Sequence, residues 1–158
     1  MALLQDGAVH LFWRAEVLDQ WCSELTELGY ATHTADCTNQ ARMRDAVSEI
    51  LQWQEQFGYG PWTGNLDAFN DGMRGFPFGP SGKAALILKR FDLFVRADPR
   101  SAEVVLDILE CQARDHLLAG NRLLVLVQTD DPAFSPPPLG ARKPSWNPQE
   151  WSNAARGL

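Results

Sequence analysis

The chain has few cysteines, few histidines and few basic residues, and it has no long hydrophobic run. Its three cysteines and three histidines show no C-x-x-C or H-x-x-x-H spacing, so no disulfide framework, metal site or cofactor site is predicted. Fourteen basic against 20 acidic side chains argue against a protein that binds nucleic acid directly, because phosphate contacts need a basic face. No stretch approaches the roughly 20 apolar residues of a membrane helix, and residues 1–10 lack a signal-peptide pattern. These absences favour a cytoplasmic protein.

Apolar content and charge indicate one folded domain followed by a different kind of segment. With 158 residues, 45% of them hydrophobic, the chain can bury a sizeable core without disulfides. Residues 1–131 carry a net charge of −8, whereas residues 132–158 carry +2 and hold six of the ten prolines. The sequence therefore predicts an acidic domain over 1–131 and a Pro-rich, mildly basic extension over 132–158. Polyproline-type structure is expected there, with Trp146 and Trp151 as docking points.

Hydrophobic periodicity predicts an α/β fold. Short apolar segments at 8–13, 30–37, 84–88 and 122–128 are typical of strands, and helical spacing occupies 14–28, 40–56, 64–75 and 102–118. The predicted order is β-α-β-α-α-β-α-β. Since 84–88 and 122–128 are apolar without alternation, they suit a small, mostly parallel sheet of about four strands that is covered by helices on both faces.

The short helix at 64–75 is the best candidate for a functional site. It follows a rigid Gly/Pro/aromatic loop at 57–63, and Asp67 and Asp71 stand at i and i+4 on one face. Side chains expected to face outward or flank its apolar side are Trp62, Asn65, Asp67, Asn70, Asp71 and Arg74. From the pattern alone, a protein-recognition patch and an ordinary polar helix face are equally good interpretations. A hydrolase that uses the two acids is a weaker hypothesis, because no histidine stands beside them; no catalytic residue is predicted.

The helix and its surroundings resemble the barstar family of ribonuclease inhibitors. The family motif has an aromatic residue, two intervening positions of which the first is often glycine, and then Asn-hydrophobic-Asp-Ala-hydrophobic-x-Asp. Residues 62–71 match it. The similarity covers roughly residues 8–129 and includes the apolar strand LILKRFD at 86–92.

The resemblance implies a small α/β inhibitor whose short helix and preceding loop enter a nuclease cleft. It assigns the role of dominant anchoring acid to Asp71, of second acid to Asp67 and of loop-helix contact to Asn65. Trp62 stands where the family has a tyrosine, and Phe76 follows Gly75 as in the family's Gly-aromatic ending. Asp115 is the nearest candidate for a further acid late in the last long helix.

Departures from the family pattern concern the same surface. Pro61 and Trp62 replace paired tyrosines, Thr63 replaces a glycine, Asn70 stands where tryptophan is frequent, and Arg74 replaces a small polar residue. A cation among the docking acids would repel a cationic cleft. The expected partner is therefore not the family's best-known ribonuclease, and an enzyme with an acidic spot opposite Arg74 would fit.

The sequence thus predicts an immunity protein without enzymatic activity, a monomer that binds and inhibits one cognate bacterial toxin, expected to be a ribonuclease, in a 1:1 complex. The alternative is an adaptor that binds a partner through the Pro-rich tail.

Overall fold

Strands and helices alternate along most of the chain, as the hydrophobic pattern predicts. The computed structural model describes residues 7–140 and 142–158. In chain order the elements are β1 (Val9–Phe12), α1 (Ala15–Glu27), β2 (Ala31–Asp36), α2 (Gln40–Ile50), α3 (Trp53–Phe57), α4 (Leu66–Arg74), β3 (Lys83–Lys89), α5 (Phe91–Ala97), α6 (Pro99–Leu118), β4 (Arg122–Gln128), β5 (Ser145–Trp146) and the 3-10 helix η1 (Ala154–Arg156). The α/β class is confirmed.

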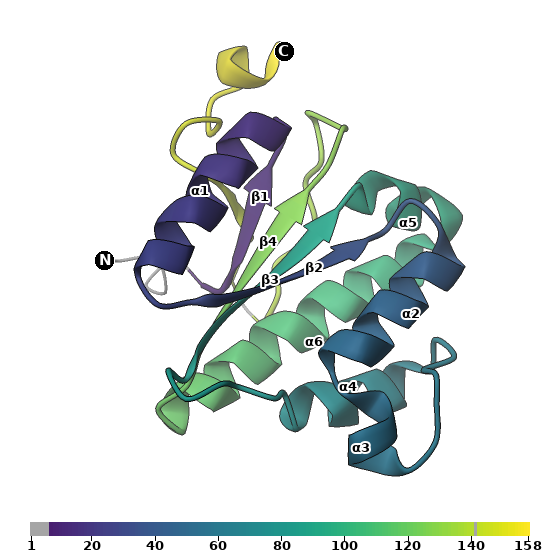
Figure 1. Cartoon of the computed structure of the whole chain (residues 1–158). Helices are drawn as coiled ribbons and strands as arrows, with labels where there is room; N and C mark the ends of the chain where they lie inside the picture. Colours follow the sequence, from purple (N-terminus) through teal and green to yellow (C-terminus); the bar gives the residue numbers. More distant parts are fainter. Residues whose placement is uncertain (1–6, 141) are drawn as a thin grey trace.

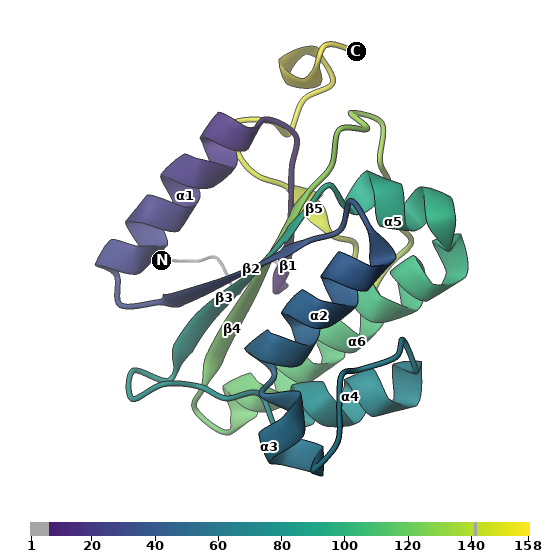
Figure 2. The ribbon, with the colours of Figure 1, turned by 45° about the vertical axis from the view of Figure 1, so that its right-hand side comes forward.

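All five strands of the described residues lie in one parallel sheet, in the order β2-β3-β4-β1-β5. The two apolar strands β3 and β4 are central, and Leu86 pairs with Val125. Helix α1 covers one face of the sheet, while α2 to α6 cover the other (Figures 1 and 2). Because helices cover both faces, the central strands are buried on both sides, as their unbroken apolar sequences predict.

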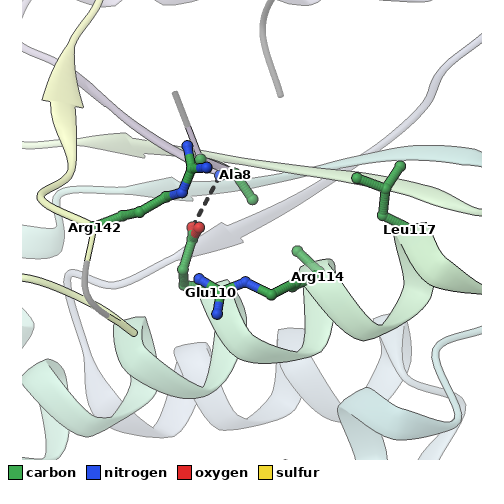
Figure 3. A pocket seen from close by; sticks show the side chains of 7 residues that line it. Ala8, Glu110, Arg114, Leu117 and Arg142 are labelled. Atoms are coloured by element: carbon green, nitrogen blue, oxygen red, sulfur yellow. Dashed lines mark hydrogen bonds between the residues drawn. The ribbon is translucent and has the colours of Figure 1, made fainter. Parts of the chain in front are cut away.

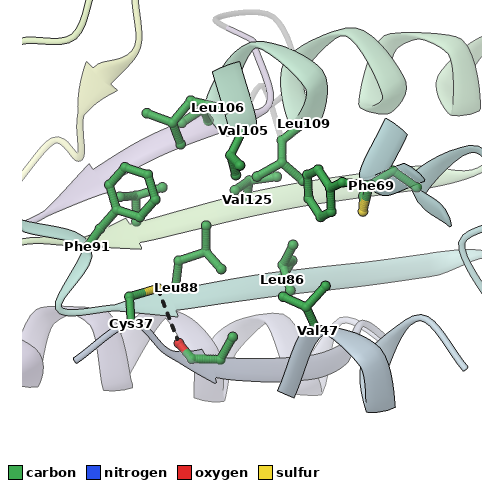
Figure 4. Close-up of a cluster of buried hydrophobic side chains, with 14 of the residues drawn as sticks. Cys37, Val47, Phe69, Leu86, Leu88, Phe91, Val105, Leu106, Leu109 and Val125 are labelled. Carbon is green, nitrogen blue, oxygen red and sulfur yellow. Dashed lines mark hydrogen bonds between the residues drawn. The ribbon is translucent and has the colours of Figure 1, made fainter. Parts of the chain in front are cut away.

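Each face of the sheet has its own core. On the α1 side, Leu18 packs with Phe12, Ile87 and Leu124. The larger core lies under α2 to α6, and Figure 4 shows part of it. Its members there include Val47, Phe69, Leu86, Leu88, Phe91, Val105 and Leu109. Phe69 belongs to α4, so the larger core is also what fixes the candidate helix to the body of the protein.

Two left-handed residues divide segments that were expected to be continuous, one from the periodicity and the other from the family resemblance. The expected helix over 40–56 is broken where Gln52 takes a φ of 50°, which separates α2 from α3. A strand reaching Asp92 was also expected, but Arg90 has a φ of 54° and starts α5 instead. Neither residue is a glycine, which is the residue that ordinarily adopts this conformation. The expected continuous helix over 40–56 and the expected strand to Asp92 are both wrong.

The segment after Asp131 packs on the sheet and is not a separate extension. Strand β5 pairs with β1, so that Leu11 stands opposite Trp146, and both the backbone N–H and the side-chain amide of Asn147 donate to the Leu11 carbonyl at 3.0 Å. The prediction that the compact part ends near Asp131 is therefore wrong. Trp146 is half-buried with the Arg156 guanidinium stacked 4.2 Å from its ring centre, which removes it from the expected docking points; Trp151 remains exposed.

Buried charges hold this terminal segment in place. The fully buried carboxylate of Glu150 accepts hydrogen bonds from the backbone N–H groups of Trp13 and Arg14, at 2.9 and 3.0 Å. It thereby satisfies donors at the start of α1, whose N-cap residue Arg14 offers no side-chain cap of its own. The buried guanidinium of Arg156 donates to the carbonyl oxygens of Pro132 and Glu150, both at 2.7 Å.

Candidate functional site

Helix α4 lies within the predicted range 64–75, but it begins two residues later, at Leu66, and ends one residue earlier, at Arg74. The side chain of Asn65 caps it by accepting a hydrogen bond from the Ala68 N–H at 2.9 Å. Asp67 lies in the first turn, where a negative charge is favourable, and Arg74 lies in the last turn, where a positive one is. Local sequence therefore explains why a helix of only nine residues has well-defined ends.

The inner face of α4 is packed unusually closely. Phe69, Gly72 and Met73 are buried, and the far edge of the Trp53 indole lies directly against Gly72. A Cβ at position 72 would come within 2.7 Å of Trp53 Cζ3 and 3.2 Å of Leu51 Cδ1. A side chain as small as alanine's therefore does not fit unless α4 moves.

Gly72→Ala is expected to lower the free energy of unfolding by about 1–2 kcal/mol, because overpacking outweighs the gain in helix propensity. It should also weaken partner binding, since α4 carries the exposed acids. Gly79→Ala is the control, because a Cβ at position 79 meets nothing within 4 Å. Chemical denaturation of both variants measures the difference; equal stabilities would show that α4 is not held against Trp53.

Two polar contacts from α6 also fix α4. The side-chain amide of Gln112 donates to Asn70 Oδ1 at 2.8 Å, and His116 Nε2 lies 2.8 Å from the carbonyl oxygen of Met73. Asn70 is therefore half-buried and already engaged within the chain. Asp115 is exposed on α6, one turn beyond Gln112, so it lies on the part of α6 that borders α4.

The outer face of α4 presents two acids and one base. Asp67, Asp71 and Arg74 are exposed, and their spacing places them in one stripe along the helix, opposite the buried Phe69. Arg74 Nη1 lies 3.5 Å from Asp71 Oδ1 in an exposed ion pair. The described surface thus joins Asp67, Asp71 and Arg74 with Asp115 beside them, and these four residues are called the α4 stripe below.

Trp62 and Phe76 are buried, which corrects the expected outward position of Trp62. The Trp62 ring is 3% exposed, its centre lies 5.2 Å from that of Phe69, and its indole N–H donates to the Asn65 carbonyl at 2.7 Å. Phe76 is 5% exposed. Both side chains are buried beneath the loops at the two ends of α4 and support these loops. Direct contact with a partner remains a prediction for the exposed residues.

The loop before α4 rests on a charged side chain. Gly64 has a φ of 99°, and a Cβ there would come within 2.7 Å of Arg44 Nη2. Glycine is favoured at position 64 because of this backbone conformation, whereas the end of the flexible Arg44 side chain can shift away from a Cβ. Arg44 on α2 thus supports the turn that leads into Asn65.

Two of the hollows in the described surface concern the site and the start of the sheet. One, of about 320 Å³, borders the loop and is lined by Trp53, by polar and acidic residues between Ser48 and Glu55, and by Gly60 and Pro61. The other, of about 190 Å³, lies between β1 and α6, where Glu110 accepts a hydrogen bond from the Ala8 N–H among Arg114, Arg142 and Leu117 (Figure 3). Within residues 7–140 and 142–158, no cluster of three or more His, Cys, Asp or Glu side chains is placed to hold a metal ion.

Sequence reasoning missed the residues that position the site. Trp53 belongs to α3 and Gln112 to α6, and only the fold brings them to Gly72 and Asn70 of α4. The available signal was Gly72 itself, because a glycine inside a short helix is unfavourable unless close packing requires it.

Comparison with known proteins agrees with this geometry. A family model described as Barstar (barnase inhibitor) matches residues 30–128, well over half of the chain, from the residue before β2 to the end of β4. The chain therefore belongs to the barstar family, and membership indicates a role of the ribonuclease-inhibitor type. Strand β1 and helix α1 lie outside the match, so it is shorter than the resemblance expected over 8–129. Neither the curated proteins nor the solved structures contain a match to the chain.

None of the helices in the described part of the chain combines the length and the apolar character needed to cross a membrane.

Proposed function

We propose that this protein is an immunity protein that inhibits a cognate bacterial toxin, a ribonuclease, in a 1:1 complex in the cytoplasm. The observation that carries the proposal is the α4 stripe, whose Asp67 and Asp71 are exposed on a helix that packs against Trp53 and α6, in a chain of the barnase-inhibitor family. On this proposal α4 and its preceding loop enter the toxin's active-site cleft.

The physical basis is competition between carboxylates and phosphates. A ribonuclease cleft is cationic because it binds the RNA backbone, so an acidic helix is attracted over a distance and raises the association rate. Once docked, the carboxylates pair with lysines and arginines in a site from which water has been removed. Binding energy is then concentrated in a few central residues.

The alternatives receive less support. Asp67 and Asp71 lie on the outer face of a helix, whereas catalytic carboxylates act in a cleft. An adaptor that uses the tail would have only Trp151 of its two expected docking tryptophans, because Trp146 already stacks with Arg156.

Asp71→Ala is expected to weaken binding of the toxin by at least about 2 kcal/mol, which is roughly 30-fold, because a central anchoring acid is lost. The nuclease is first identified by mass spectrometry after capture on the full chain, and affinities are then measured by titration calorimetry. Asp19→Ala is the matched control, since Asp19 is exposed on α1, on the opposite face of the sheet.

High salt should slow association of the wild-type chain more than it speeds dissociation. If Asp71→Ala binds as tightly as Asp19→Ala, the docking surface is not α4. If the captured partner has no nuclease activity, the ribonuclease part of the proposal is wrong.

A further inference from the structure

We propose that the hollow of about 320 Å³ beside the loop before α4 is a second docking site, which receives a basic peptide segment of the partner. It is called the Trp53 hollow below, and it is lined by Trp53, by polar and acidic residues between Ser48 and Glu55, and by Gly60 and Pro61. This inference rests on the proposed function, since the partner is the nuclease that α4 engages, and it extends the docking surface beyond the α4 stripe.

The tryptophan in this hollow carries a buried hydrogen-bond donor without an acceptor. Trp53 is 2% exposed, and no acceptor among the described residues is bonded to its indole Nε1. The other buried side-chain donor of the described chain in this condition, Arg44 Nε, does not line the hollow. A buried donor without a partner costs stability, and native proteins satisfy nearly all such groups. Trp53 Nε1 is therefore a group that an acceptor from outside the chain can complete.

The indole is oriented so that this donor lies at the wall of the hollow. Its benzene edge lies against Gly72 of α4. Its pyrrole edge lies at Gly60, because a Cβ at position 60 would stand 3.6 Å from Cδ1, the carbon bonded to Nε1. Glycine at position 60 thus leaves this edge of the ring without a side chain over it. Since Nε1 is itself buried, an entering carbonyl oxygen reaches it by a small displacement of the exposed loop residues Gly60 and Pro61.

The charges of the hollow select a basic segment. Glu49 and Glu55 are exposed, and the described lining residues include no lysine or arginine. A negative charge suits Glu55 in the first turn of α3, but Glu49 stands in the last turn of α2, where the helix dipole disfavours it. The dipole therefore does not explain the pair. Lysines or arginines of a nuclease, which bind RNA phosphates, would neutralise both acids.

The remaining polar groups of the hollow suit a peptide backbone. The side-chain amides of Gln52 and Gln54 also line it, and each can donate to a carbonyl oxygen and accept from an N–H group. Every residue of an entering segment except proline offers both. One of its carbonyl oxygens would accept from Trp53 Nε1, while its basic side chains lie against Glu49 and Glu55.

The loop joins the Trp53 hollow to α4. Gly60 and Pro61 line the hollow, the next residue, Trp62, is anchored by its N–H to Ser48 Oγ at 2.8 Å, and Asn65 caps α4. A partner that takes this loop and α4 into its cleft therefore meets the hollow with the wall of that cleft.

Indole NMR signals test the site with a defined probe, an acetylated and amidated pentapeptide of alternating glycine and arginine. The Trp53 Nε1–H signal is assigned by its absence from the spectrum of Trp53→Phe. The peptide at millimolar concentration should move this signal downfield in a saturable way, because the N–H gains an acceptor. The Trp62 signal is the internal control and should stay in place, since its N–H already donates to the Asn65 carbonyl at 2.7 Å. An unchanged Trp53 signal, or the same shift with a peptide of glycine and glutamate, would overturn the inference.

Gly60→Ala tests whether the nuclease captured on the full chain uses the hollow. Its affinity for the nuclease should be about tenfold lower than that of the wild type, because the added methyl group covers the pyrrole edge of Trp53. The methyl group fits at an ordinary contact distance, and Gly60 has no positive φ, so chemical denaturation should show unchanged stability. Gly79→Ala is the control, because a Cβ at position 79 meets nothing within 4 Å, and it should bind as the wild type does.

A pair of substitutions tests the charges separately. Glu49→Gln combined with Glu55→Gln should weaken binding of the captured nuclease about tenfold and slow association. Glu24→Gln combined with Glu27→Gln is the matched control, since both acids are exposed on α1, on the opposite face of the sheet (Figure 1), and the change in net charge is the same. This control should stay within about threefold of the wild type.

Equal affinities of Gly60→Ala and Gly79→Ala would overturn the inference, because the hollow would then be outside the interface. Equal losses from the two pairs of glutamate substitutions would overturn it as well, because net charge alone would explain them. In both cases the proposed function is judged separately, by Asp71→Ala against the same nuclease.

Discussion

Replacing Glu150 with alanine is expected to lower the free energy of unfolding by about 3 kcal/mol. The substitution leaves the backbone N–H groups of Trp13 and Arg14 without their acceptor and removes one of the two acceptors of the Asn147 side-chain amide. Because these groups lie where β1 ends and α1 begins, the terminal segment and the first βα unit should both loosen. Urea denaturation measures the change. Glu24→Ala removes an exposed acid from α1, and this control should stay within about 0.5 kcal/mol of the wild type.

The contribution of Glu150 should also depend on pH. Burial by itself raises the pKa of Glu150, but hydrogen bonds from Trp13, Asn147 and Arg14 outweigh burial and hold it below the ordinary 4.5. A depressed pKa in the folded state means that the stabilisation is complete above about pH 4.5 and is lost as the pH falls through the lower folded value. A carboxyl group titrates between about pH 5 and about pH 3. Over this range the free energy of unfolding should fall less for Glu150→Ala than for the wild type. If the free energy of unfolding fell equally with pH in both proteins, Glu150 would not be the group that causes the pH dependence.

Trp53→Ala is expected to cost about 4 kcal/mol and to lower the melting temperature by about 10 °C. Trp53 is 2% exposed, and its ring contacts those of Phe57 and Trp62, so truncation leaves a large cavity under α4. Trp151→Ala is the matched control, because Trp151 is 72% exposed and should change stability by less than about 0.5 kcal/mol.

On the proposed function, the same substitution should also weaken binding of the captured nuclease, because α4 packs on the Trp53 indole at Gly72. Trp53→Phe keeps an aromatic ring and should fall between the wild type and Trp53→Ala in both stability and affinity. If Trp53→Ala were folded and bound the toxin as tightly as the wild type, α4 would not depend on this support.

Elements with a strong local signal could be predicted from the sequence. The run of apolar residues in β4 predicts a strand that is covered on both faces, and its bounds are the expected ones. Helix α4 could be predicted because Asn65 is a good cap and Phe69 and Met73 share a face. In both cases neighbours along the chain decide the structure.

Features decided by distant contacts could not be predicted in this way. Gln52 and Arg90 adopt left-handed backbone conformations, which no local sequence pattern predicts for glutamine or arginine. The local sequence does not decide whether Trp62 is exposed or buried. It is buried because Trp53 and Phe69, which belong to other elements, pack against its ring. The role of Glu150 depends on Trp13, which lies 137 residues earlier in the chain.

The pairing of β1 has a consequence for the timing of synthesis. This strand is made first, yet Val9 pairs with Val125 and Leu11 with Trp146. At about 5–20 residues per second, β1 leaves the ribosome roughly 10 s before its neighbours exist, and its apolar residues remain available to chaperones in the meantime. On the proposed function, protection lags behind translation by this interval.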